Sequence, residues 1–354
     1  VNSNVNQIVV WSCNNTIQQI NKHPKVKTVH VPTLDHNLIF RMIWQRWILP
    51  SQILKNNCDI LFSPGGILPG SIQVPSVILS QNLLPFEDRE RRRFPFFSFM
   101  RHKLLLIRIM QIHSMQNTDG LIFLSDYACK TILSFLSVQK KFIVKIPHGI
   151  ERRFFNTPKI DIKANDVIFK LLYVSTIDVY KHQWNVAEAV VELRKKNFQV
   201  SVDFIGGFYG PAKKRLLKYM KEVDPHENFL HYKGVVPYEK LHSIYASSNA
   251  FVFASSCENL PNILIEAMAS GLPIVSSNLG PMPEVLKECG LYFNPEDPED
   301  IAEKLIQLIE NPLAAKEMSD CSYLESQNYS WKRTTKETFD FIEEVYLESI
   351  NDIR

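Results

Sequence analysis

The sequence predicts an α/β protein built from two doubly wound domains. Three observations support this fold class. Short β-branched runs alternate with longer segments of helical period, the whole pattern occurs twice, and a polar segment at 151–166 that contains Pro158 separates the two sets. Near-continuous apolar strands that alternate with helices are typical of a parallel sheet covered on both faces.

The first set contains six expected strands and two expected helices. The strands are 7–11, 28–31, 60–63, 76–79, 120–124 and 142–146, and the helices are 37–56 and 97–117. A doubly wound domain usually begins with a strand and a Gly-rich turn. Because the first residue is Val1 and the first glycine is Gly65, we expect the chain to begin inside a domain, without its first strand and helix. The alternative is a variant that has no such turn.

The second set contains six further strands and five helices. The strands are 169–175, 200–205, 229–232, 250–254, 273–276 and 290–293, and the helices are 183–196, 212–223, 238–247, 263–270 and 300–310. The predicted domains are therefore 1–155 and 156–330. Ligands of such sheets bind at the carboxyl ends of the strands, which places the expected site in a cleft between the domains.

Composition limits the class of protein. The chain has 354 residues, of which 45% are hydrophobic and 22% are charged, so it is long enough for two cores. No apolar run reaches the length of a membrane helix, and no signal peptide opens the chain. The six cysteines are far apart and lack the spacing of a zinc site or a disulfide framework, so we expect free thiols in a reducing cytosol.

Charge is distributed unevenly along the chain. Residues 1–150 carry 17 Lys and Arg against 7 Asp and Glu, a net charge of +10. The remaining residues carry 23 against 30, a net charge of −7, which together give the overall +3. A basic first half and an acidic second half indicate different partners for each.

The strongest chemical signal lies in residues 255–273, where two glutamates, Glu258 and Glu266, flank a Pro-Asn pair. Pro261 suits the start of a helix, and Gly271 suits its end. The unpaired N–H groups at 260–263 would bind an anion such as a diphosphate. Glu266, about one turn into this helix, could accept hydrogen bonds from a ribose diol, and Glu258, in the loop before it, from hydroxyls of a transferred sugar.

This segment resembles the signature of glycosyltransferase family 4, the retaining glycosyltransferases with the GT-B fold. The resemblance extends over nearly the whole chain. It includes 146–150 (IPHGI), 174–181, 204–207 (FIGG), 233–236 (KGVV) and 280–285, and also Ser330-Trp331 at the start of the last helix. It implies a GT-B fold with two Rossmann-like domains that face each other across a cleft. Residues 1–155 would be the acceptor side, 156–330 the donor domain, and 331–354 a helix that crosses back to the first domain.

The resemblance also implies roles for individual residues. Lys181 would neutralise the donor diphosphate and Glu258 would position the sugar, which makes them the expected catalytic residues. The implied donor-binding set is Lys181, Gly234, Val235, Val236, Glu258, Asn259, Leu260, Pro261, Asn262, Ile263 and Glu266. The implied acceptor side is Gln81, Asn82 and His148. No metal and no cofactor is expected, because the nucleotide-diphosphate sugar is itself a substrate, and neither glutamate is assigned as a base.

The chain departs from the family pattern at several positions. Thr176 stands where the family commonly has an arginine that contacts the diphosphate, so Lys181 would have less help unless Arg152 or Lys145 reaches the site. Gln81-Asn82 replaces a His-Asp pair of the first domain, and the Gly-rich turn that approaches the donor phosphates is absent.

Residues 86–103 combine cations with aromatic side chains, from Arg89 through Arg93 to Lys103. Cations beside exposed aromatics suit an anionic membrane surface, and bacterial relatives often build glycans there. We therefore expect a cytoplasmic enzyme, peripheral on the inner face of the membrane. The alternative is a solvated row of arginines followed by a helix with core phenylalanines. No nucleic-acid motif accompanies these charges.

The expected function is transfer of a hexose from a nucleotide-diphosphate donor to a glycan or lipid-linked acceptor in cell-surface polysaccharide synthesis. Two alternatives stay open. One is a sugar-nucleotide epimerase of the same fold, which would need acid–base residues in the first domain. The other is a non-catalytic or truncated nucleotide-sugar-binding homologue, which Thr176 and the missing glycine turn would favour.

Overall fold

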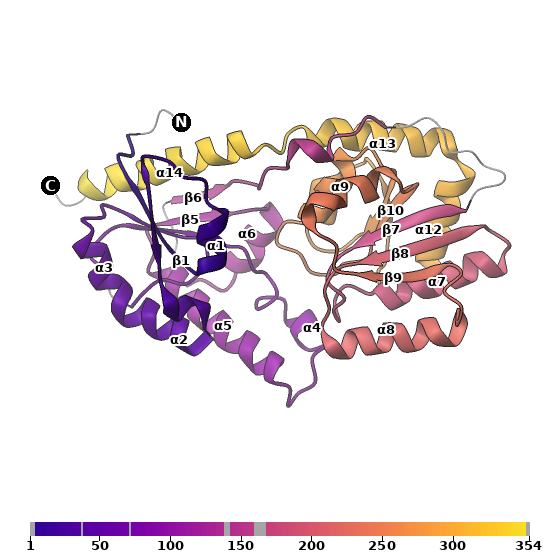
Figure 1. The fold of residues 1–354 in the computed structure, drawn as a ribbon, viewed down its shortest axis with the longest axis horizontal. Helices are drawn as coiled ribbons and strands as arrows, with labels where there is room; N and C mark the ends of the chain where they lie inside the picture. Colours follow the sequence, from indigo (N-terminus) through magenta and orange to yellow (C-terminus); the bar gives the residue numbers. More distant parts are fainter. Residues whose placement is uncertain (1–3, 37, 71, 138–141, 159–167, 352–354) are drawn as a thin grey trace.

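Parallel β-sheets form the centre of both halves of the molecule (Figure 1). The computed structural model describes residues 4–36, 38–70, 72–137, 142–158 and 168–351. In the first half, β1 (Ile8–Ser12) pairs with β2 (Val26–His30), and a separate sheet has the order β3 (Leu61–Ser63), β4 (Ser76–Leu79), β5 (Gly120–Phe123), β6 (Phe142–Lys145). The second half holds six strands, β7 (Phe169–Val174), β8 (Val200–Ile205), β9 (Leu230–Gly234), β10 (Ala250–Phe253), β11 (Ile274–Ser277) and β12 (Leu291–Phe293).

Helices connect the strands and cover the sheets. Those of the first half are α1 (Asn14–Gln19), α2 (Leu38–Ile43), a π-helical turn (Trp44–Ile48), α3 (Leu49–Lys55), α4 (Asp88–Arg91), α5 (Phe99–Gln116) and α6 (Asp126–Leu133). Those of the second half are α7 (Gln183–Lys195), α8 (Gly210–Val223), α9 (Tyr238–Ala246), α10 (Asn262–Ala269), α11 (Met282–Leu286), α12 (Pro298–Glu310), α13 (Pro312–Ser326) and α14 (Trp331–Asn351).

The six-stranded sheet has the order β12-β11-β10-β7-β8-β9, and all its pairings are parallel. Numbered from β7, this is the Rossmann order 3-2-1-4-5-6 read from β9 to β12. The chain winds outward from β7 in one direction and then, starting at β10, in the other. The switch point therefore lies between β7 and β10, and a ligand crevice is expected at their carboxyl ends.

Every strand expected from the sequence is present, with bounds that differ by at most a few residues. The strands of the first half form two separate sheets, because β1 pairs with β2 but, within the described residues, no strand joins them to β3. The expected helix at 37–56 is divided into α2, the π-helical turn and α3, whose first turn holds Pro50. Of the expected linker at 151–166, residues 159–166 lie outside the described part of the chain, so the domain boundary at 155/156 stays a prediction.

Helix α14 returns from the second half to the first and covers one face of the four-stranded sheet (Figure 1). Its Phe341, Ile342 and Val345 pack with Val77 and Ile122 of β4 and β5. The opposite face of this sheet packs against α5 and α6. In the part of the chain that the structure describes, no helix combines the length and apolarity needed to cross a bilayer.

Two cysteines form a disulfide, so the expectation of six free thiols was wrong. Cys289, at the end of α11, is bonded to Cys321 in α13, with their Cα atoms 5.3 Å apart. The two residues are separated by 32 positions, and only the packing of α13 beside α10 and α11 brings them together. Spacing along the sequence could not show this pair. Cys13, Cys58, Cys129 and Cys257 are free.

The disulfide should stabilise the second half of the molecule. Closing a loop of 32 residues restricts the unfolded chain, which corresponds to about 3–4 kcal/mol in the free energy of unfolding. Cys321→Ser should lower that free energy by this amount, measured by urea unfolding in the absence of reductant. A reducing agent should abolish the difference between the variant and the parent. Equal stability of the two proteins without reductant would contradict the assignment.

Candidate active site

The loop between β7 and α7, residues 175–182, brings Lys181 to the switch point. The main chain of the loop is fixed at both ends, because Ser175 N donates to Ile205 O at 2.8 Å and the Tyr173 hydroxyl donates to Lys181 O. The Lys181 side chain is buried, and its Nζ lies over the rings of Tyr180 and Phe253 at 5.1 and 5.6 Å. A cation is therefore held over aromatic faces at the carboxyl end of the central strand.

His182 closes this loop in a left-handed conformation, with φ of +50°. Its Nε2 lies 3.0 Å from Ser256 Oγ, which in turn donates to Tyr180 O, so the histidine ties the loop after β7 to the loop after β10. Burial, together with the nearby Arg93 and Arg89, lowers the pKa of His182 to about 3. The imidazole is thus neutral near pH 7 and acts as a structural link.

The second loop, residues 254–261 between β10 and α10, carries Glu258. As expected, the helix follows a proline, since Pro261 directly precedes Asn262, and it ends before Gly271. Gly271 has φ of +65°, and a Cβ there would lie 2.6 Å from Asn156 O, so only glycine fits at this position. Pro261 before the helix and Gly271 after it thus limit α10 to eight residues.

Lys181 and Glu258 form an ion pair between the two loops, Nζ to Oε1. Only 7% of the Lys181 side chain and 16% of the Glu258 side chain are exposed. A pair this buried is held mainly by the mutual attraction of its charges, and removing either partner leaves a buried charge without compensation. The two residues that the resemblance implies for catalysis therefore lie in direct contact.

Glu266 faces two tyrosines rather than solvent. Its Oε1 accepts from the Tyr238 hydroxyl and its Oε2 from the Tyr245 hydroxyl, both at 3.1 Å. Burial raises the pKa of the Glu266 carboxyl to about 7, although both hydrogen bonds and Arg153 act in the opposite direction. Near neutral pH this carboxyl therefore changes charge readily, and it can exchange tyrosine hydroxyls for other donors.

A cavity of about 200 Å³ lies beside Glu266. Its lining includes Gly149, Ile150, Tyr238, Asn262, Ile265, Glu266 and Trp331. His148 reaches this region from the first half, with its Nδ1 3.3 Å from Asn262 Nδ2 and its ring stacked on Trp331. Burial lowers the pKa of His148, so its ring is neutral near pH 7. The cavity is thus bounded by both halves of the molecule.

The carboxyl ends of the two larger sheets meet at Asn259. The side-chain Nδ2 of Asn259 donates to Ser80 O at 2.8 Å, just after β4. The main-chain carbonyl of Asn259 accepts from Ser125 Oγ at 2.6 Å, just after β5. The Oδ1 atom of Asn259 is buried, and within the described residues it has no hydrogen-bond partner. The resemblance implied that Asn259 binds the nucleotide-sugar donor. Its hydrogen bonds with Ser80 and Ser125 were not expected from the sequence.

Glu284 also joins the halves, which the sequence did not indicate beyond its place in the 280–285 element. Its carboxylate accepts from the main-chain N–H groups of Asp126 and Tyr127 at 2.8 and 3.0 Å, at the first turn of α6. Lys145 lies 3.3 Å from the same carboxylate and 2.6 Å from Asp126. The sequence had left open whether Lys145 assists Lys181. In the structure Lys145 pairs with Asp126 and Glu284 instead.

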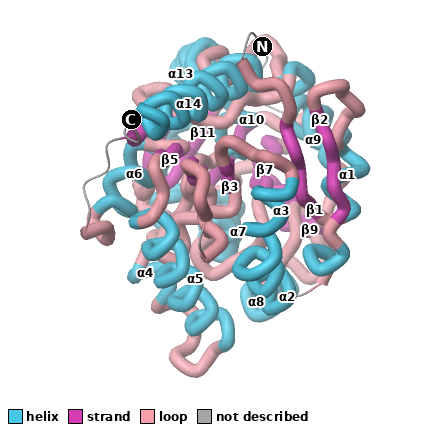
Figure 2. Tube along the Cα trace, turned by 90° about the vertical axis from the view of Figure 1, so that its left-hand side faces the viewer, coloured by secondary structure: helices cyan, strands magenta, loops and turns pink. Residues whose placement is uncertain are grey.

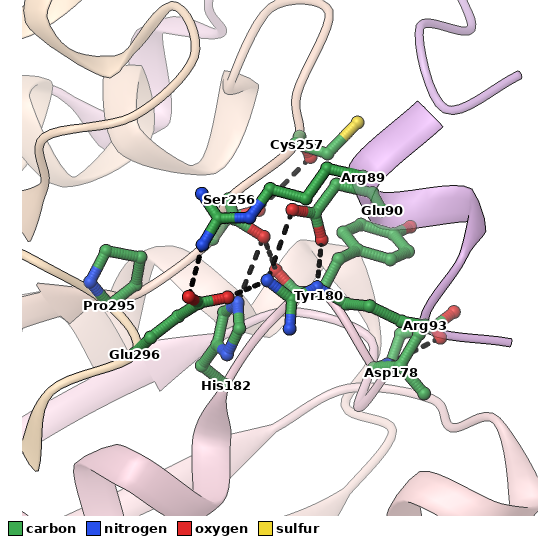
Figure 3. Close-up of polar contacts among 12 residues, drawn as sticks. Arg89, Glu90, Arg93, Asp178, Tyr180, His182, Ser256, Cys257, Pro295 and Glu296 are labelled. Atoms are coloured by element: carbon green, nitrogen blue, oxygen red, sulfur yellow. Dashed lines mark hydrogen bonds and ion pairs between the residues drawn. The ribbon is translucent and has the colours of Figure 1, made fainter. Parts of the chain in front are cut away.

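Arginines of α4 and the turn after it contact the second half directly (Figure 3). Arg89 and Arg93 both pair with Glu296, in the loop after β12, and Arg93 also binds the buried Glu90 with Nε 2.5 Å from Oε2. In Figure 3 these groups surround Tyr180, His182 and Ser256. The ion pairs thus hold α4 and the turn after it against the loop after β12.

The remaining expected residues lie around this centre. Gln81 and Asn82 are exposed in the loop after β4, and Asn82 Oδ1 accepts from Leu84 N.

Gly234 lies at the end of β9 with φ of +70°, and its carbonyl accepts from Gly206 N. The next residue, Val235, is 74% exposed. Leu260 is buried, and Ile263 O accepts from the Tyr245 hydroxyl. The main-chain carbonyl of Thr176 accepts a hydrogen bond from Gln183 Nε2 at 3.0 Å.

Comparison with other proteins identifies the second half. Residues 158–324 match the family described as "Glycosyl transferases group 1". The chain is 26% identical over 169 residues to the O-antigen chain mannosyltransferase B of Escherichia coli, covering 48% of this chain and 44% of that one. It is 32% identical over 109 residues to a sulfoquinovosyl transferase of Arabidopsis thaliana, covering 29% and 21%. The chain thus spans less than half of either relative.

Solved structures match over a larger share of the chain. The sucrose-phosphate synthase of Thermosynechococcus elongatus is 17% identical with a TM-score of 0.74, covering 93% of this chain and 86% of that one. Anabaena HepE in complex with UDP and glucose is 13% identical with a TM-score of 0.69, covering 93% and 88%. Likenesses at these identities show the fold. The chain therefore has the GT-B fold, and its residues 158–324 match the family described as glycosyl transferases group 1.

Proposed function

We propose that this protein is a retaining glycosyltransferase that moves a hexose from a nucleotide-diphosphate donor to a glycan or lipid-linked acceptor in cell-surface polysaccharide synthesis. The single observation that carries the proposal is the contact of Lys181 with Glu258 at the switch point of the six-stranded sheet, with Glu266 in the helix that follows. The E. coli relative named as an O-antigen chain mannosyltransferase and the HepE complex with UDP and glucose support the substrate class.

The diphosphate would bind where Lys181 and the start of α10 meet. Lys181 would supply the positive charge, and the main-chain N–H groups of Asn259 and Leu260 would supply donors beside the helix start, since Pro261 has no N–H and that of Asn262 donates to Leu260 O. The incoming phosphate competes with Glu258 for Lys181. The carboxylate released in this way is then available to hydroxyls of the transferred sugar, which couples sugar binding to diphosphate binding.

The nucleoside would occupy the cavity beside Glu266. In this arrangement the ribose diol replaces the tyrosine hydroxyls on the Glu266 carboxylate, and the base approaches the main chain of residues 234–236. The sequence places the acceptor on the opposite side, towards Gln81, Asn82 and His148. His148 contacts Asn262, so a residue expected to bind the acceptor substrate lies next to one expected to bind the donor substrate.

In the reaction, the bond from the anomeric carbon to the donor phosphate oxygen breaks and a bond to the acceptor oxygen forms on the same face of the sugar. The proton of the acceptor hydroxyl passes to the departing diphosphate, so no side chain is needed as a base. Lys181 stabilises the negative charge that develops on the leaving group, and the two loops hold the reactants in place.

Loss of Lys181 should remove most of the activity. Lys181→Ala should lower the rate of nucleotide diphosphate release by about 10²–10³-fold, because a positioned positive charge at the leaving group is lost. Release is measured with UDP-, GDP- and ADP-sugars and an acceptor extract. The matched control is Lys195→Ala, at the exposed end of α7.

Glu266→Ala should weaken binding of the donor substrate in the same assay. Equal release by both site variants and the parent would contradict the proposal, and an epimerised sugar nucleotide formed from donor alone would favour the epimerase.

Nucleotide affinity should rise with pH through the titration of Glu266. The pKa of this carboxyl is about 7 in the protein without ligand, and only its ionised form accepts hydrogen bonds from both ribose hydroxyls. Between pH 6 and pH 8, affinity for the preferred nucleotide diphosphate should therefore increase by about tenfold, measured by calorimetry. Glu266→Gln provides the control, since it retains the titration of the phosphate itself but lacks the carboxyl. If the variant and the parent show the same pH dependence, Glu266 does not hold the ribose.

A further inference from the structure

Three phenylalanines project from the turn that joins α4 to α5. Phe96, Phe97 and Phe99 are 62%, 90% and 80% exposed, and the Arg101 guanidinium lies 5.0 Å from the ring centre of Phe96. This turn is the lowest part of the molecule in Figure 1 and also in Figure 2, which is turned about the vertical axis. The alternative interpretation as core residues was therefore wrong for these three phenylalanines, whereas Phe86 and Phe94 of the same stretch are buried.

Helix α5 continues this apolar surface along its exposed face. Phe99, Leu106 and Ile109 follow one another at i, i+7 and i+10, which places them on one side of a helix. Leu106 and Ile109 are 48% and 58% exposed, whereas Leu104 and Met115 of the same helix are buried. The amphipathic helix thus buries one apolar face in the protein and presents a second apolar stripe to the outside.

A second exposed apolar group lies in the turn after α2. Ile43, Trp47 and Ile48 are 48%, 74% and 39% exposed, and Arg46 lies 5.8 Å from the ring centre of Trp47. The segments 36–58 and 91–118 contain no Asp or Glu at all. Both exposed apolar groups are therefore surrounded only by neutral and basic residues of their own segments.

Helix α8 of the second half adds a row of lysines on the same side of the molecule. Figures 1 and 2 both place α2, α5 and α8 along its lower side. Lys213, Lys214, Lys218 and Lys221 surround Gly210 and Leu217 on the outer face of α8. Although the second half is acidic overall, its surface next to the aromatic turn is basic.

The cations of this surface differ from those expected from the sequence. Arg89 and Arg93 pair with Glu296, and Arg91 pairs with Asp88, so three of the four arginines at 89–93 neutralise acids of the protein. The row of arginines therefore joins the two halves. The positive charge that faces outward comes from α8 and from residues that flank the aromatic turn, such as Arg101.

We propose that this side of the molecule docks on an anionic lipid bilayer, with Phe96, Phe97 and Phe99 inserted at the headgroup boundary and the lysines of α8 in contact with lipid phosphates. Aromatic side chains next to cations suit the interfacial region, and each base near an anionic surface adds to the attraction. The docking surface contains residues of both halves, from the aromatic turn and α5 in the first and from α8 in the second. It deepens the proposed function, since it would bring a lipid-linked acceptor to the cleft, but binding to lipid does not require catalysis.

Charge favours a bilayer over a second copy of this chain. Two copies that shared this face across a twofold axis would bring α8 lysines of one copy close to those of the other or leave them beside apolar groups. Like charges at such an interface oppose association. An anionic bilayer complements both features, because it accepts the aromatic side chains and attracts the lysines.

The test is co-sedimentation with lipid vesicles. The parent protein should bind vesicles that contain about one-third phosphatidylglycerol and should bind phosphatidylcholine vesicles far more weakly, and added salt should release it. Replacing both Phe97→Ser and Phe99→Ser should weaken binding by about tenfold or more, because two exposed rings no longer enter the boundary. Replacing Lys214→Gln, Lys218→Gln and Lys221→Gln should weaken binding to the anionic vesicles by about a hundredfold and remove most of its salt dependence.

The matched control replaces two exposed leucines of α13, Leu313→Ser and Leu324→Ser, which are 82% and 63% exposed and lie outside the proposed surface. It should bind vesicles like the parent. Equal binding by the parent, the serine variant and the control would overturn the proposal. So would a dimer, seen by sedimentation velocity, that Phe97→Ser and Phe99→Ser dissociate. Lys181→Ala should still bind vesicles, and the phenylalanine variant should still release nucleotide diphosphate in solution, which separates this proposal from the catalytic one.

Discussion

The ion pair between Lys181 and Glu258 is the interaction on which the rest of the site depends. It joins the loop after β7 to the loop after β10, the two strands between which the winding of the sheet reverses. Lys181 is buried and Glu258 is largely buried, so removing either partner leaves a charge that water compensates poorly. Such a pair keeps the lysine and the carboxylate in fixed positions. A ligand with more negative charge than one carboxylate can compete with Glu258 for Lys181. We infer that this ligand is the donor diphosphate.

The loop after β10, helix α11 and the loop after β12 together form the seam between the two halves. Asn259 binds the main chain after β4, Glu284 caps α6, and Glu296 holds the arginines of α4. These contacts bring the carboxyl ends of both larger sheets together around the cavity beside Glu266. A donor bound by the second half would therefore lie directly against residues of the first half.

The sequence predicted the strands and the bounds of α10 well, because both signals are local. Apolar runs of four to six residues indicate strands, and a proline followed by a glycine indicates where the helix begins and ends. The roles of Glu258 and Glu266 stay predictions. Contacts between distant segments had no such signal. Tyr238 and Tyr245 on Glu266, Glu284 on α6, and the bond from Cys289 to Cys321 all depend on tertiary packing. Charge composition was also misleading at Arg89 and Arg93, since a basic run looks the same in the sequence whether it meets solvent or Glu296.

The most direct test of the central claim is calorimetric binding of a nucleotide diphosphate and of the corresponding nucleotide-sugar to Glu258→Gln. If Glu258 competes with the diphosphate for Lys181 and then holds the sugar, the variant should bind the nucleotide diphosphate about threefold to tenfold more tightly than the parent, because a competing negative charge is gone. The additional affinity that the sugar gives in the parent should be lost. If Glu258→Gln instead weakens both ligands equally, the ion pair is a structural support of the loops, and the proposed competition between Glu258 and the diphosphate for Lys181 is contradicted.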